Sequence, residues 1–244
     1  MIRTLLLRGM LAGILAGLLV FTFARLVGEP QIERAIQIEL QLDTAHGETD
    51  HDAPEHETIT RTIQRGVGLL TGVVLYSVAL GGLFSLVFAF AYGRIQSLRP
   101  RVLSAVLAGL GFVAIVLVPM MKYPANPPSV GSPDTIGVRT AAYFLLLAFS
   151  ILTMSLCFKI GRIIRYRVGV WNATLLAGGL YLFLISIIAY FLPVIDEVPA
   201  VFPALLLWRF RIAALGLQAV LWTSLALLFG WFAERELTTS ADSI

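Results

Sequence analysis

The 244-residue sequence has one cysteine, few charged residues and none of the short motifs that mark common enzymes. Cys157 alone cannot form an intrachain disulfide or a cysteine-cluster metal site. Charged residues make up 14% of the chain, well below their share in ordinary soluble domains. No G-x-x-x-x-G-K-[ST], G-x-S-x-G, H-E-x-x-H or C-x-x-C pattern occurs. These absences argue against an enzyme.

What the sequence has in abundance is apolar residues, at 58% of the chain. They are grouped into stretches about as long as the roughly 20 residues that a membrane-spanning helix needs. The stretches lie near 5–27, 67–92, 102–121, 140–160, 174–192 and 203–231. The sequence therefore predicts an all-α, polytopic membrane helix bundle with six transmembrane helices, forming a single membrane domain over residues 1–244.

The segments between the apolar stretches alternate in charge. The basic ones contain Arg3 and Arg8, then Arg94, Arg99 and Arg101, then Lys159, Arg162, Arg165 and Arg167. Because cytoplasmic loops of membrane proteins carry an excess of Lys and Arg, both termini are predicted to be cytoplasmic (N-in/C-in) in an inner, multi-pass membrane location. We interpret the net charge of +3 as this topology signal and expect no nucleic-acid partner.

The same topology predicts three outer loops. Residues 28–65 form an acidic, histidine-containing loop, 122–138 a proline-rich loop, and 193–203 a second acidic loop. Residues 36–43 alternate apolar and polar side chains, which fits a strand, but a helix that extends from the membrane surface is equally compatible.

The first outer loop holds all three histidines, interleaved with carboxylates. Imidazole and carboxylate groups are ligands for divalent transition metals such as cobalt, nickel or zinc. The five-residue spacing puts successive histidines on no common helix or strand face, so a site would need the loop to fold around the ion or a partner to add ligands. A solvated acidic loop with incidental histidines is the alternative. The candidate metal ligands are His46, His51, His56, Asp50, Asp52 and Glu55.

Inside the predicted spans, small and polar residues replace charges. Spans two, three and five lack ionisable residues in their central parts, which argues against a self-sufficient pump. Gly9, Gly13 and Gly17 recur every four residues and predict close approach of a second helix. That helix could belong to the same chain or to a second copy in a homo-oligomer.

Two arginines stand near the outer end of the sixth span. Arg209 and Arg211 project about 200° apart on a helix, so they cannot serve one face together. Snorkelling to the headgroups is one interpretation. The other is an ion-pair clamp with acids of the outer segments, namely Asp196, Glu197, Glu29 and Glu33.

Three segments carry a resemblance to a known family. They are LLLRGMLAGILAGLLVFTFARLVGEPQIERAI, KYPANPPSVGSPDTIGVRT and FPALLLWRFRIAALGLQAVLW, and the likeness extends over essentially the whole chain. The sequence resembles the CbtA family of proposed cobalt transporter subunits. The resemblance implies an association with cobalt uptake for cobalamin synthesis and a small, histidine-bearing single-span partner, CbtB.

Together these observations predict a membrane subunit of a divalent transition-metal uptake system, with cobalt the favoured ion. The outer loop would gather the ion, and the helices would form or complete its path. We expect no permanently bound cofactor, a transported Co²⁺ ion, contact with membrane lipid, and a CbtB-like partner. The main alternative is a non-transporting membrane scaffold or assembly factor, and an intramembrane enzyme is a distant third.

Overall fold

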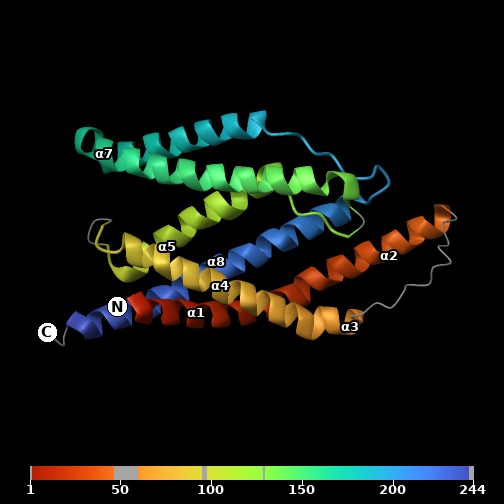
Figure 1. Cartoon of the computed structure of the whole chain (residues 1–244), viewed down its shortest axis with the longest axis horizontal. Helices are drawn as coiled ribbons and strands as arrows, with labels where there is room; N and C mark the ends of the chain where they lie inside the picture. The colour runs from red at the N-terminus through yellow and green to blue at the C-terminus, as the bar shows by residue number, and fades with distance from the viewer. Residues whose placement is uncertain (1, 47–59, 95–97, 129, 242–244) are drawn as a thin grey trace. The chain divides into compact units, whose positions relative to one another are not determined.

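The described part of the computed structural model is predominantly helical (Figure 1). It covers residues 2–46, 60–94, 98–128 and 130–241, and contains no strand within those ranges. Five helices in it are long and apolar enough to cross a membrane: Ile2–Gln41, Arg61–Ala91, Pro100–Lys122, Ile136–Phe191 and Ala204–Thr238. The predicted all-α class and the series of apolar helices are therefore confirmed.

The first long helix continues well past the expected end of the first span. It consists of α1 (Ile2–Phe23), the π-helical turn η1 (Ala24–Gly28) and α2 (Glu29–His46). Pro30 in a regular helix would clash with a carbonyl one turn earlier, and the wider π turn directly before it accommodates the ring. Of the two alternatives for residues 36–43, the structure has the helix.

Two further long helices have the same composite build. One consists of α3 (Arg61–Ile63), η2 (Gln64–Gly68) and α4 (Leu69–Ala91), and the other of α5 (Pro100–Gly111), η3 (Phe112–Leu117) and α6 (Val118–Lys122). Pro119 again lies just after a π turn, in the first turn of α6, and the helix continues to Lys122.

The last part of the chain contains the 3₁₀ turn η4 (Pro133–Thr135), α7 (Ile136–Phe191) and α8 (Ala204–Ala241). Inside α7, Gly169 has φ +80° and ψ 163°, a conformation that is essentially restricted to glycine. The chain reverses there, so α7 is two helical arms, 136–168 and 170–191 (Figure 1). The apolar stretches predicted a loop between residues 160 and 174, whereas the helix persists on both sides of one glycine.

The chain divides into two compact units. Unit 1 contains the described residues of 1–109, 127–129 and 202–244, and unit 2 those of 110–126 and 130–201. In unit 1, α1 packs along α4 and against α8. In unit 2, Ser150 and Tyr181 share a 2.7 Å hydrogen bond between the arms of α7, and Leu146 packs with Ile185 in the same core.

The contact between α1 and α4 in unit 1 is a glycine interface, in which Gly9, Gly13 and Gly17 of α1 face Ser77 and Gly81 of α4. A Cβ added at Gly13 would lie 2.8 Å from the Cα of Val78, closer than real Cβ atoms approach. Of the two predicted uses of these glycines, the structure has the packing within one chain.

Aromatic rings fill the space between α4 and α8 in unit 1. Phe84 meets Phe229 edge-to-face at 5.5 Å between ring centroids and Trp222 at 6.4 Å, and Phe88 meets Phe229 at 5.0 Å. Edge-to-face contact is a favoured aromatic geometry and adds to the gain from burial. Phe88 and Phe229 are fully buried, so this cluster joins α4 to α8.

Candidate functional site

The predicted metal-binding loop falls largely outside the described residues. His46 is the last residue of α2, and nothing is described of its side chain. His51, His56, Asp50, Asp52 and Glu55 lie outside the described ranges, so the metal-ligand set stays a prediction. Within the described ranges, no group of three or more His, Cys, Asp and Glu side chains could hold a metal ion.

The helix that leads into this loop is tied to the next one by two ion pairs. Arg61 donates to Glu29 at 3.0 Å, and Arg65 lies 3.7 Å from Glu33. The Glu29 side chain is 8% exposed and that of Glu33 is 47% exposed, so only the first pair is shielded from water. The two pairs therefore join α2, which precedes the loop, to α3 and η2, which follow it.

The spacing of these four residues in the sequence is a signal for their pairing, although the pairing itself was not predicted. Glu29 and Glu33 are four residues apart, and so are Arg61 and Arg65. Four-residue spacing places both members of each couple on one helix face, which gives two complementary charged faces. The spacing does not indicate that these faces meet, because Glu29 and Arg61 are 32 positions apart along the chain.

A second set of ion pairs lies elsewhere in unit 1, around the end of α8. Arg8 of α1 pairs with Glu236 and donates to the carbonyl of Phe232, and Arg101 of α5 pairs with Glu234. The starts of α1 and α5 are therefore held to the last turns of α8. In the sequence these arginines served only as topology signals, and their partners were not predicted.

In unit 2, the acidic segment near residue 197 is fixed to the start of α7. Glu197 accepts from the hydroxyl of Thr135 and pairs with Arg139, and its side chain is 4% exposed. Nearby in the same unit, the Tyr123 hydroxyl donates to the carbonyl of Pro193 at 2.8 Å. Burial raises the pKa of this phenol, so it stays a neutral donor at physiological pH.

The predicted clamp of Arg209 or Arg211 with an outer acid stays a prediction. The ion pairs that the structure gives to Glu29, Glu33 and Glu197 are with the arginines described above. Arg209 lines a pocket between α2 and α8, where its neighbours are apolar residues, amides and Arg34.

Besides Arg61 Nε, three buried side-chain polar atoms of unit 1 lack a hydrogen-bond partner among the described residues. They are Ser77 Oγ on α4 and Gln218 Oε1 and Trp222 Nε1 on α8. Unpaired polar groups are costly in an apolar interior. Gln218 and Trp222 are four residues apart and thus share a face of α8.

Comparison with known protein families gives one match, a family described as "Probable cobalt transporter subunit (CbtA)", over residues 2–234. Neither the curated proteins nor the solved structures gave a match. The family match covers four of the five long apolar helices in full and most of the fifth, which confirms the resemblance seen in the sequence and agrees with a multi-pass membrane protein of transition-metal transport. The word "subunit" implies a partner in a transporter complex. The chain belongs to the CbtA family of probable cobalt transporter subunits.

Proposed function

We propose that this chain is the membrane-embedded subunit of a cobalt uptake system, that its acidic, histidine-containing outer loop gathers the ion, and that Co²⁺ is cargo and not a resident cofactor. The observation that carries the proposal is the family match over residues 2–234 of a chain with five long apolar helices. The proposal assigns no enzymatic step to the chain.

Composition supports the role of the loop. Between residues 39 and 57 the sequence has seven acids, three histidines and no Lys or Arg. Such a segment attracts a divalent cation by its field and offers nitrogen and oxygen ligands. Imidazole coordinates only when neutral, so cobalt affinity should fall as the pH drops through about 6.5.

Six spans with both termini in the cytoplasm are part of the proposal. The two arms of α7 pack antiparallel, which supports counting them as two spans. The ion pairs of Arg8 and Arg101 with the end of α8 support a common side for the N-terminus, the α4–α5 connection and the C-terminus.

Thiol labelling in intact cells tests this topology. Cysteines introduced at Thr60 and at Tyr166, which are both exposed, should differ in their reaction with an impermeant reagent. Position 60 should be labelled from outside and position 166 only after permeabilisation. The native Cys157 is buried and serves as the background. Labelling of position 166 in intact cells would overturn the orientation.

The proposed partner is a small, histidine-bearing single-span membrane protein of the CbtB type. Such a partner would add the imidazoles that a sparse loop lacks and complete a path beside the subunit. Lipid contact, an inner-membrane location and a homo-oligomeric state belong to the same proposal.

Cobalt accumulation in cells that lack other cobalt importers tests the function. At limiting metal, cells that produce the chain with its partner should accumulate several times more cobalt than cells that produce the partner alone. A scaffold or assembly factor would leave the two equal when the partner is present at equal amount, and that result would reject the proposal.

A further inference from the structure

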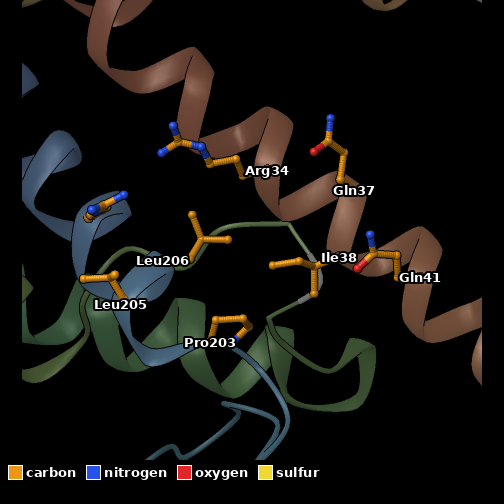
Figure 2. Close-up of a pocket in the computed structure, with 8 residues that line it drawn as sticks. Arg34, Gln37, Ile38, Gln41, Pro203, Leu205 and Leu206 are labelled. Carbon is orange, nitrogen blue, oxygen red and sulfur yellow. The ribbon is translucent and has the colours of Figure 1, made fainter.

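A pocket of about 310 Å³ lies between α2 and the start of α8, within unit 1 (Figure 2). The α2 residues recur at intervals of three and four and so form one helix face. The pocket is lined by Arg34, Gln37, Ile38 and Gln41 of α2, by Pro203, and by Leu205, Leu206 and Arg209 of α8.

The pocket carries two positive charges that no acid balances within the described residues. Neither Arg34 nor Arg209 has a carboxylate within 4.0 Å among those residues, in contrast to Arg61 and Arg65 on the neighbouring helix. Arg34 donates to Gln31 at 3.2 Å, and this one bond leaves most of its five N–H donors for a ligand. The amides of Gln37 and Gln41 add further donors. This charge repels a divalent cation and favours an anion.

The rest of the pocket is apolar. Figure 2 shows Ile38 pointing across the pocket toward Leu206, with Leu205 and Pro203 beside it. Leu205 and the nearby Trp208 are more than 60% exposed. Aromatic residues are common at the level of lipid headgroups, so an acyl chain could run along this side while its phosphate meets the arginines.

We propose that this pocket binds the phosphate of an anionic phospholipid, with Arg34 and Arg209 as its ligands and the leucines as the wall for the acyl chain. Guanidinium groups suit phosphate because they present several N–H donors in a fixed plane. The pocket lies at the first turns of α8, where the helix dipole also favours negative charge.

The bound lipid would join the two helices that line this pocket. Its phosphate bridges α2, which leads into the acidic loop, and α8, which continues into the aromatic core of unit 1. The proposal goes beyond metal uptake, because the lipid site requires no metal and its two arginines would disfavour one.

Native mass spectrometry of the purified full chain tests the site, with phosphatidylglycerol as the probe. Wild type should retain one more tightly bound phosphatidylglycerol than the Arg34→Gln, Arg209→Gln double variant. Loss of charge-assisted hydrogen bonds should weaken that binding about tenfold or more. Arg25→Gln is the matched control, because Arg25 is an exposed arginine of the same continuous helix outside the pocket.

Two further probes separate the sources of this chemistry. Phosphatidylcholine, whose phosphate is neutralised by choline, should bind at least severalfold more weakly than phosphatidylglycerol. Inorganic phosphate at millimolar concentration should not displace the lipid. Equal retention of both lipids, displacement by free phosphate, or unchanged binding in the double variant would each overturn the proposal.

A charge-preserving variant covers the case in which the double variant does not fold. Arg34→Lys with Arg209→Lys keeps the charge but loses the planar donor array, so phosphatidylglycerol binding should weaken only partly. In wild type the same binding should fall as NaCl rises, because the arginines are exposed and are screened by salt. Binding that is indifferent both to Lys and to salt contradicts the site.

Discussion

The glycine interface between α1 and α4 and the ion pairs of unit 1 hold helices of that unit together by opposite means. At the glycine interface the backbones approach so closely that no Cβ fits at Gly13, and Ser77 beside it is fully buried. In the ion pairs, arginines and glutamates from distant parts of the chain meet, as Arg8 meets Glu236 and Arg61 meets Glu29.

The contrast follows from the free-energy cost of placing an ionised side chain in each environment. An ionised side chain at the centre of a membrane is expensive, so close packing of small residues is the available source of attraction there. Where headgroups and water reach, charges are tolerated, and a pair between two helices fixes their relative position. The glycine interface thus has no space for an ion, and any cation path has to run elsewhere.

The largest effect is expected from filling the glycine interface. Gly13→Leu should lower the free energy of unfolding by about 3 kcal/mol or more, the upper range for overpacking, because backbone and not a flexible side chain opposes it. Thermal unfolding in mild detergent measures the change. Gly72→Leu on α4, where nothing lies within 4 Å of an added Cβ, is the control and should be nearly neutral. Equal effects of the two variants would contradict the tight contact.

An intermediate effect is expected at the α2 ion pairs, and it should be unequal. Glu29→Gln removes the charge from a shielded pair whose arginine already has a buried Nε without a hydrogen bond, so unfolding should become easier by about 1–3 kcal/mol. Glu33→Gln, in an exposed pair, should cost about 1 kcal/mol or less. The same unfolding measurement compares them, and a larger loss at Glu33 would reverse our assignment of the stronger pair.

The smallest effect is expected around the end of α8. Arg8→Gln should destabilise by about 1 kcal/mol, because Arg8 makes both an ion pair and a bond to the Phe232 carbonyl. The Arg101 side chain is 56% exposed, so Arg101→Gln should lower the free energy of unfolding by less than Arg8→Gln does. Raising the salt concentration should reduce the difference in free energy of unfolding between wild type and each variant. Variants that are insensitive to salt would show that packing, and not charge, holds this end.

The sequence predicted the apolar helices, the close approach at Gly9, Gly13 and Gly17, and the family. Their signals are local, because composition, periodicity and short motifs can be read within one segment. It could not say which helix the glycines face, since a contact within the chain and a contact between copies need the same small residues.

Helix ends were harder to predict than helices. The first apolar stretch was expected to end near residue 27, yet the helix passes through a π turn and continues to His46. Around Gly169 the expected loop of several residues is a single glycine in a conformation that other residues rarely adopt. In both places residue preferences alone predict a longer interruption of the helix than the backbone has.

The partners in the ion pairs could not be predicted from the sequence, for a different reason. Glu29, Glu33 and Glu197 are ion-paired, but with arginines other than the two that the sequence suggested. Such pairing depends on how separate segments pack, because Arg139 and Glu197 are 58 positions apart along the chain. Charge pattern alone therefore predicts where pairs form better than it predicts which residues form them.

The concentration dependence of cobalt uptake tests the proposed transport function most directly. Three strains without other cobalt importers are compared. One produces the partner with the wild-type chain, the second produces the partner with the His46, His51, His56→Ala triple variant, and the third produces the partner alone. We predict saturable uptake with wild type, and for the triple variant a higher cobalt concentration at half-maximal rate with a similar maximal rate. Identical curves for wild type and triple variant would contradict ion capture by the loop, and uptake no greater than with the partner alone would contradict the transport function itself.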